Sequence, residues 1–368
     1  MRAIAITPQK GNPHLVDRPA PAAPGANQVL LRILAVGICG TDREEATGDY
    51  AQPPAGANEL VIGHEMLGQV EAVGTAVRRV GAGDRAVFTV RRGCGRCGPC
   101  AMNRSDMCQT GLYRERGIRG LDGYQTERVL DDEQYVVRVP PELGLAGVLT
   151  EPTSVAEKAI DEAVRLQIAR QPFAGATPDW LYGRRCLVAG LGPIGLLAAL
   201  ILRLRGAQVY GLDIVPEDSA RPQWLRAIGG SYINGKQSPS DALRDLTAGG
   251  AELIVEAAGI ATLSFELVDA LAPGGAYVLT GLPGGDRPLQ LSGSALIRRL
   301  VLGNHAMVGS VNAARGHFQM AVDDLHAAQL RWPGHLEKLI THRHAPDDFA
   351  AVFTQHPPDE IKAVILWE

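Results

Sequence analysis

One short stretch sets the architecture of the second half of the chain. Residues Leu187–Gly195 read LVAGLGPIG, a G-x-G-x-x-G pattern that follows a run of apolar residues. The pattern predicts a strand over Cys186–Ala189 and a helix from Pro193 to about Arg205, because proline is tolerated in the first turn of a helix. A strand, a glycine turn and a helix in this order are typical of a dinucleotide-binding loop, although a strand–helix turn that binds no ligand is the alternative.

The loop also predicts how a cofactor would be held. The first glycine permits a tight turn, the second lets the backbone approach a diphosphate, and the third lets helix and strand pack closely. The next predicted strand, QVYGLD, ends in a carboxylate that would bind both ribose hydroxyls and repel a 2′-phosphate, which favours NAD. Arg221 and Arg226 follow and keep NADP as the alternative. The predicted contacts in this region are Gly190, Gly192, Pro193, Ile194, Gly195 and Asp213.

The spacing of apolar residues differs between the first 150 residues and the region after residue 184. Short apolar segments separated by Ala- and Leu-rich segments recur after residue 184, which predicts a doubly wound parallel sheet. Residues 1–150 instead show strand-like spacing, as in Gln28–Val36 and Met66–Gly74, and KAVILWE is a plausible last strand. A helix is predicted over Ser154–Arg170, capped by Thr153 or Ser154, with a linker over Gln171–Trp180. The predicted fold class is therefore α/β, with a β-rich domain and a Rossmann domain.

Composition excludes several classes of function. The 368 residues are 46% hydrophobic and 21% charged, with a net charge of −4 and no basic patch, so we expect no nucleic-acid partner. The N-terminus lacks an apolar signal region, and the longest apolar stretch, near Leu196–Leu202, is too short to cross a bilayer. We therefore expect a cytoplasmic protein with no membrane partner, in which clustered cysteines bind metal.

Four of the six cysteines lie within RRGCGRCGPCAMNRSDMC, residues 91–108. Four thiolates fill the tetrahedral coordination of Zn²⁺ and leave no open position, so we predict a structural zinc lobe over residues 91–110. An iron–sulfur cluster on the same thiolates is the alternative. Cys186, in a predicted strand, is expected to be a buried core thiol. The predicted ligands of the lobe are Cys94, Cys97, Cys100 and Cys108.

A second set of metal donors is spread over three distant segments. Cys39 lies in GICGTD, His64 in GHE and Glu151 in TEPTS. Three protein ligands leave the fourth position of a zinc ion open, which is the catalytic arrangement. The sequence therefore predicts two zinc ions per chain, one catalytic and one structural.

Together these segments resemble the zinc-dependent medium-chain alcohol dehydrogenase family. Its signature GHExxGxVxxVG reads GHEMLGQVEAVG here, over Gly63–Gly74. The resemblance covers essentially the whole chain. It implies a GroES-like catalytic domain of residues 1–184 and 309–368, a Rossmann domain of residues 185–308 and a homodimer or homotetramer.

The resemblance also assigns roles to individual residues. The three donors named above match the ligands of the catalytic zinc, and Glu65 matches an acid that can approach or replace a ligand. Asp42 matches the acid that orients the ligand histidine. Thr41 matches the hydroxyl that binds the substrate oxygen and starts a proton relay. Glu44 stands near the position of the usual relay histidine, so water is the expected carrier from there.

Three longer segments, GICGTDREE, CQTGLYRERGIRGLDGY and EPTSVAEKAI, resemble the glucose dehydrogenases of this family more specifically. Those enzymes oxidise the C1 hydroxyl of aldoses and surround the sugar with polar residues. Asn312 matches an amide near both the sugar and the nicotinamide. The implied substrate contacts are Thr41, Glu115, Glu151 and Asn312, with Glu157 and His305 as weaker matches.

The implied activity is zinc-dependent oxidation of an aldose such as D-glucose at C1 to the lactone. NAD is favoured over NADP, since Asp213 is followed by Ile-Val-Pro where many of these enzymes carry arginine. A zinc polyol dehydrogenase of the sorbitol type, or another secondary-alcohol dehydrogenase, is the alternative enzyme. The alternative without catalysis is a nucleotide-binding scaffold.

Overall fold

The computed structural model describes residues 1–368 except 49, 172–179, 238–242, 286–287 and 368. Most of the predicted linker, Gln171–Trp180, lies outside the described residues. The chain forms two compact units, one of Met1–Ser154 with Asn312–Glu368 and one of Val155–Val311. The sequence placed these divisions after residues 184 and 308.

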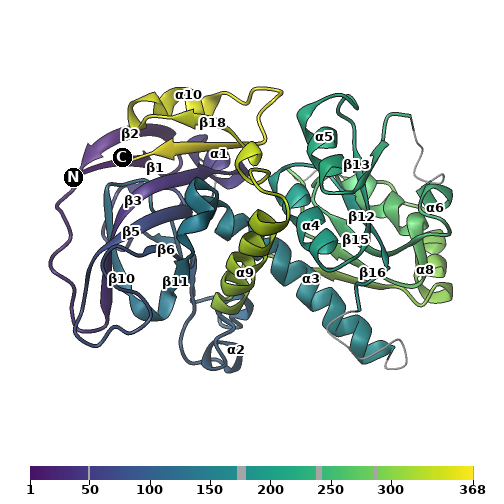
Figure 1. Ribbon diagram of the computed structural model, residues 1–368, viewed down its shortest axis with the longest axis horizontal. Coiled ribbons are helices and arrows are strands. Elements are labelled where there is room, and N and C mark those ends of the chain that lie inside the picture. Colours follow the sequence, from purple (N-terminus) through teal and green to yellow (C-terminus); the bar gives the residue numbers. More distant parts are fainter. Residues whose placement is uncertain (49, 172–179, 238–242, 286–287, 368) are drawn as a thin grey trace. The chain divides into compact units, whose positions relative to one another are not determined.

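The second unit is built on a fully parallel six-stranded sheet (Figure 1). When the strands are numbered by their order in the chain, their order across the sheet is 3-2-1-4-5-6. This is the doubly wound order of dinucleotide-binding folds. The predicted Rossmann sheet is therefore confirmed. Across the sheet the strands are β14 (Ser231–Asn234), β13 (Gln208–Asp213), β12 (Arg185–Ala189), β15 (Ala251–Glu256), β16 (Leu271–Leu279) and β17 (Ala306–Gly309).

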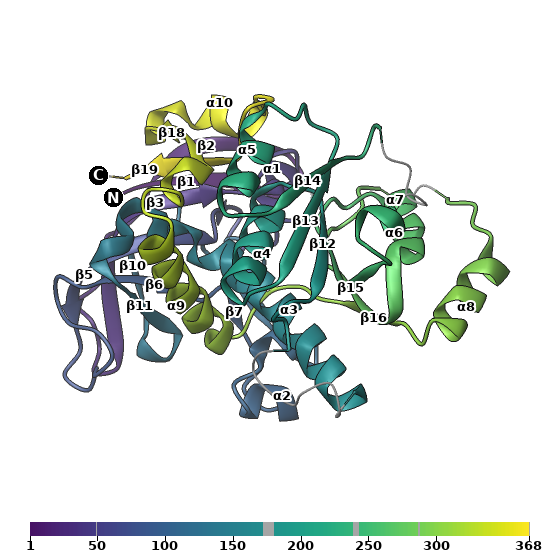
Figure 2. The same cartoon turned by 45° about the vertical axis from the view of Figure 1, so that its right-hand side comes forward.

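Helices cover both faces of this sheet. α4 (Pro193–Leu204) and α5 (Ala220–Ala227) lie on one face, whereas α6 (Leu243–Leu246) and α8 (Gly293–Leu302) lie on the other (Figures 1 and 2). α7 (Ala261–Glu266) precedes β16. Because both faces are covered, the central strands carry apolar residues on both sides, and their buried side chains form the core of the unit.

The first unit contains one large and two small sheets. β3 (Gln28–Ile38) is central, because it pairs with strands from both ends of the chain. The large sheet runs β11 (Val136–Val139), β6 (Arg85–Phe88), β5 (Glu65–Val73), β3, β19 (Lys362–Leu366) and β18 (Ile340–His344), with β10 (Arg128–Asp132) also on β3. The small sheets are β2 (Gly11–Asp17), β1 (Arg2–Thr7) and β4 (Leu60–Val61), and β7 (Arg91–Arg92), β8 (Arg114–Arg116) and β9 (Gly120–Leu121).

One predicted helix boundary was wrong. α3 (Thr150–Arg170) begins four residues before Ser154, and the Thr153 hydroxyl donates to the Leu149 carbonyl instead of capping the helix. Glu151 therefore lies in the first turn of α3. Most of α3 belongs to the second unit, and the α-helices that lie wholly within the described residues of the first unit are α1 (Gly40–Ala46), α2 (Gly98–Ala101), α9 (Arg315–Arg331) and α10 (Phe349–Thr354). Among the described residues, no helix combines the length and the apolar character needed to cross a membrane.

Candidate active site and metal centres

Three metal donors meet where β3 and β5 pair. Cys39 follows β3 and caps α1, while His64 and Glu65 stand at the start of β5. The two strands are antiparallel, with Gly37 opposite Glu65, so the end of one lies beside the start of the other. Cys39 Sγ lies 3.1 Å from His64 Nε2, and the donor atoms of Cys39, His64 and Glu65 all lie within 4.8 Å of one another. The fold thus brings together donors that are 25 residues apart.

Asp42 faces the imidazole of His64 from its Nδ1 side. Its Oδ1 lies 3.4 Å from His64 Nδ1, and its Oδ2 accepts the Cys39 backbone N–H at 2.8 Å. Asp42 is fully buried. Burial opposes its charge, but His64 and the Cys39 N–H hold the pKa of Asp42 below its usual range. A thiol, an imidazole whose second nitrogen faces a carboxylate, and a further nearby carboxylate fit a zinc ion.

Sequence reasoning missed a buried lysine at this site. Lys362 Nζ donates to Glu65 Oε1 at 2.6 Å and to the Ile38 carbonyl at 3.0 Å. Burial disfavours its charge, but Glu65 and Cys39 raise the pKa of Lys362. The available signal was one cationic residue in the apolar segment KAVIL. Glu65 is thus ion-paired as well as close to the other donors.

Glu151 lies outside the group of mutually close donors found in the described part of the chain. Its carboxyl is still within the electrostatic reach of the site. Burial raises the pKa of Glu151 to about 7, an effect that His64 opposes and Glu65 reinforces. That Glu151 is the third ligand of the metal stays a prediction, and Glu65 is the carboxylate that lies closer to Cys39 and His64.

Helix α1 carries three further residues of interest. Thr41 lies half-buried in its first turn, and Glu44 is exposed. Glu45 is fully buried, and among the described residues neither of its carboxyl oxygens has a hydrogen-bond partner. Burial and the neighbouring Asp42 raise the pKa of Glu45 to about 9, which favours the neutral acid. Sequence reasoning missed Glu45, because two adjacent glutamates at a helix surface normally indicate a solvated face.

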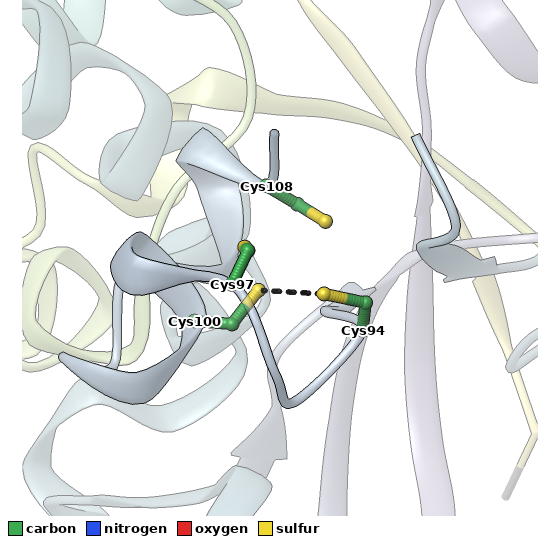
Figure 3. Close-up of side chains that lie close together, drawn as sticks. All are labelled: Cys94, Cys97, Cys100 and Cys108. Atoms are coloured by element: carbon green, nitrogen blue, oxygen red, sulfur yellow. Dashed lines mark hydrogen bonds between the residues drawn. The ribbon is translucent and has the colours of Figure 1, made fainter. Parts of the chain in front are cut away.

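The four cysteines of the lobe converge on one point (Figure 3). Their sulfur atoms all lie within 4.8 Å of one another, and Cys94 Sγ is 3.9 Å from Cys100 Sγ. Gly93 is required here, because a Cβ atom would lie 2.5 Å from Cys100 Sγ. Donation from the Thr110 hydroxyl and from backbone N–H groups lowers the pKa of Cys94 to about 5, which favours the metal-binding thiolate. The four sulfurs fit a tetrahedral zinc ion with no open position.

The predicted sugar contacts Glu115 and Asn312 touch each other. Asn312 Nδ2 donates to Glu115 Oε1 at 2.6 Å, although the two residues are 197 positions apart. Asn312 has a φ of 61°, a left-handed conformation that asparagine tolerates. The strand of Glu115 adjoins the metal donors, because a Cβ at Gly117 would lie 2.4 Å from the carbonyl oxygen of Gly63. The pair is therefore held close to the segment that carries His64.

The two weaker candidates, Glu157 and His305, lie in the second unit. Glu157 is buried in α3 and forms an ion pair with Arg205. His305 immediately precedes β17, at the amino edge of the parallel sheet. The glycine loop leaves β12 at the opposite, carboxyl edge, so the structure does not bring His305 to the loop.

The glycine loop has the geometry that diphosphate binding requires. Gly190 has a φ of 87°, and a Cβ there would collide with the Ala258 backbone at 2.7 Å. A Cβ at Gly195 would lie 1.8 Å from the Gly190 carbonyl oxygen, whereas nothing lies within 4 Å of one at Gly192. Pro193 and Ile194 form the first turn of α4. The open side at Gly192 thus lies at the N-terminus of a 12-residue helix, where phosphate oxygens find free N–H groups.

Asp213 ends β13 beside this loop. Its Oδ2 accepts the Leu191 N–H at 2.8 Å, and its Oδ1 accepts the Ile214 N–H at 2.6 Å. Each carboxylate oxygen keeps a lone pair for a ribose hydroxyl. Arg221 Nη1 lies 3.9 Å from Asp213 Oδ2, whereas Arg226 pairs with Glu217.

Comparison with known proteins matches both parts of the chain. The model described as "Alcohol dehydrogenase GroES-like domain" matches residues 25–141, and "Glucose dehydrogenase C-terminus" matches residues 144–366. The glucose 1-dehydrogenase of Methanocella arvoryzae is 39% identical over 349 residues, 93% of each chain. That of Thermoproteus tenax is 40% identical over 344 residues, 93% of this chain and 92% of its own.

Solved structures agree with these matches. The glucose dehydrogenase of Haloferax mediterranei in complex with NADP, Zn and gluconolactone superposes with a TM-score of 0.87 and 31% identity, over 100% of this chain and 99% of its own. Galactitol-1-phosphate dehydrogenase from Escherichia coli superposes over 100% of both chains with a TM-score of 0.80, but at 21% identity it shows the shared fold alone.

Proposed function

This chain belongs to the glucose dehydrogenase family of zinc-dependent medium-chain dehydrogenases, and we propose that it oxidises an aldose such as D-glucose at C1 to the lactone. We propose two zinc ions per chain and NAD in preference to NADP. The supporting observation is the set of mutually close donors at Cys39, His64 and Glu65, of which the last two are buried, because a catalytic metal needs such a set.

The reaction removes a proton from the C1 hydroxyl and a hydride from C1. When bound, zinc supplies a Lewis acid for that hydroxyl, and the nicotinamide supplies the hydride acceptor. Cys39 and His64 would hold the metal with the carboxylate of Glu65 or Glu151, and Asp42 would orient the ring of His64. The Thr41 hydroxyl would accept the substrate proton and pass its own on.

The remaining groups hold sugar and cofactor in place. Glu115 and Asn312 would bond hydroxyls of the sugar, which lets the site discriminate against simple alcohols. The loop over Gly190–Gly195 would hold the diphosphate, and Asp213 the adenosine ribose. Such residues act by alignment, since the cofactor carries the redox chemistry.

The test is a substrate and cofactor panel with the purified protein. D-glucose, D-galactose, D-xylose, sorbitol, galactitol and ethanol are assayed with NAD and with NADP, and zinc is counted per chain. We expect turnover of aldoses and two zinc ions. Turnover of polyols alone would instead identify a polyol dehydrogenase, and NAD binding without any turnover would identify a scaffold. Assembly as a homodimer or homotetramer is a further prediction, which light scattering tests.

A further inference from the structure

Arg91 connects the cysteine lobe with Glu115. The two residues stand directly opposite each other on the paired strands β7 and β8. Arg91 Nε and Nη2 each lie 3.0 Å from Glu115 Oε1, while Nη1 donates to the Asp106 carbonyl at 2.9 Å. Arg91 and Glu115 are each only 8% exposed. One guanidinium therefore spans two parts of the unit in a buried setting.

The lobe fixes the orientation of this guanidinium. Asp106 lies in the 3₁₀ turn Ser105–Met107, between the lobe ligands Cys100 and Cys108. The guanidinium carbon of Arg91 also lies 4.0 Å from the centre of the Tyr113 ring, which covers one of its faces. The guanidinium of Arg91 is planar, and it is held at one edge by the Asp106 carbonyl and on one face by the Tyr113 ring. It therefore meets the carboxylate of Glu115 in a single orientation.

These contacts leave one carboxylate oxygen of Glu115, Oε2, for a ligand. Both contacts from Arg91 and the contact from Asn312 use Oε1, and none of the three uses Oε2. A carboxylate oxygen can accept up to two hydrogen bonds, so Oε2 remains available for a sugar hydroxyl. Pre-orienting an acceptor in this way lowers the entropy lost when the hydroxyl binds.

We propose that Arg91 is a positioning residue that couples the four-cysteine lobe to the sugar site. The coupling runs from the metal ligands through the Asp106 carbonyl to Arg91, and from Arg91 to Glu115. The proposal rests on the proposed function, because it requires Glu115 to accept a sugar hydroxyl. The lobe then does more than stabilise the unit, since loss of its metal also weakens binding of the sugar.

Two substitutions of Arg91 separate its charge from its geometry. Arg91→Met removes all donors and keeps an apolar stem, whereas Arg91→Lys keeps the charge and loses the fork. Arg114→Met is the matched control, because Arg114 is the exposed neighbour of Glu115 on β8. KM is measured for D-glucose and for NAD, and the Kd of gluconolactone is measured by calorimetry.

We expect Arg91→Met to raise the KM for glucose and the Kd for gluconolactone about 10- to 100-fold, the loss typical of a charge-assisted hydrogen bond. The KM for NAD is expected to stay unchanged, Arg91→Lys to give an intermediate loss, and Arg114→Met to behave as wild type. Cys108→Ser is expected to lose the lobe zinc and to weaken gluconolactone binding. Combining it with Arg91→Met should add little to the effect of either substitution, because both act through one chain of contacts.

Unchanged glucose KM and gluconolactone Kd in Arg91→Met would overturn the proposal and leave the proposed function intact, provided that the wild type oxidises aldoses. Full additivity in the double variant would overturn the coupling to the lobe. A wild type that oxidises no aldose would overturn both the proposed function and the proposed role of Arg91. If Arg91→Met does not fold, Arg91→Lys decides, because a wild-type KM for glucose contradicts the positioning role and a raised KM supports it.

Discussion

Replacing Asp213 with asparagine tests the proposed preference for NAD. Asp213 Oδ2 accepts the Leu191 N–H at 2.8 Å, and Arg221 Nη1 lies 3.9 Å from the same oxygen. Asparagine keeps one oxygen for the Leu191 N–H, so the contact with the glycine loop is retained, and it loses only the bond of Oδ1 with the adjacent Ile214 N–H. The substitution removes the negative charge, and a 2′-phosphate would then meet Arg221 without a neighbouring carboxylate.

The expected change follows from two contributions. At an effective dielectric constant of about 20, a carboxylate and one unit of phosphate charge about 5 Å apart repel by about 3 kcal/mol. Exposure and salt reduce this to about half, which corresponds to roughly 10-fold in NADP binding. A ribose bond that loses its charged acceptor weakens by about 1 kcal/mol, or roughly 5-fold in NAD binding. The ratio of kcat/KM for NADP to that for NAD should therefore rise roughly 50-fold.

The assay measures kcat/KM for both cofactors at a saturating aldose concentration and constant ionic strength. Glu217→Gln is the matched control, because Glu217 is an exposed acid on the same loop that pairs with Arg226. We expect this control to leave the ratio unchanged. If both cofactors lose affinity equally in Asp213→Asn, the carboxylate only supports the loop, and the reasoning about the ribose is refuted.

Three further substitutions test the catalytic unit. Cys39→Ala should abolish turnover, while the circular dichroism spectrum and NAD binding stay unchanged. The control is Cys186→Ala, which removes a buried thiol of the second unit and should stay active. Substantial turnover in Cys39→Ala would refute the catalytic metal site. Cys100→Ala should lose one zinc ion per chain and melt at a lower temperature, so an unchanged zinc count and melting curve would contradict the structural lobe. Asp131→Asn should cost about 3–5 kcal/mol of unfolding free energy at pH 7, because it leaves the buried guanidinium of Arg92 without its carboxylate counter-charge. Burial opposes the charge of Asp131, but Arg92 and Arg116 lower its pKa, so its stabilisation exists above the unfolded pKa and disappears on acidification. The gap between wild type and Asp131→Asn in urea unfolding should thus narrow toward pH 3, and a gap that stays constant would count against the ion pair.

The nucleotide unit was largely predictable from the sequence because its signals are local. The glycine loop, the apolar strands around it and the acid at the end of β13 lie within 30 residues of one another, and the strands and helix they predicted match β12, α4 and β13. The start of α3 was misplaced because threonine and serine favour helix caps. In the structure their hydroxyls instead bond carbonyls of the preceding turn, as Thr153 does with Leu149.

The catalytic unit was predictable only where a motif marked it. The metal donors stand in short recognisable segments, but their partners do not. Lys362 meets Glu65 across 297 positions, and no local pattern indicates which of many charged residues will pair so far apart. Arg91 was hidden in the same way, since its significance depends on the register of β7 with β8. Glu45 could not be anticipated, because its burial follows from tertiary packing and not from the helix surface.

The position of β19 affects how the protein is made. This strand follows the whole of the second unit in the chain and is synthesised after it, yet it lies inside the large sheet, between β18 and β3. The second unit is one continuous segment, so it can fold while translation continues. Until β19 emerges, β3 keeps an open edge and Glu65 lacks Lys362, so we expect the nascent catalytic unit to be the stage at which chaperones are needed.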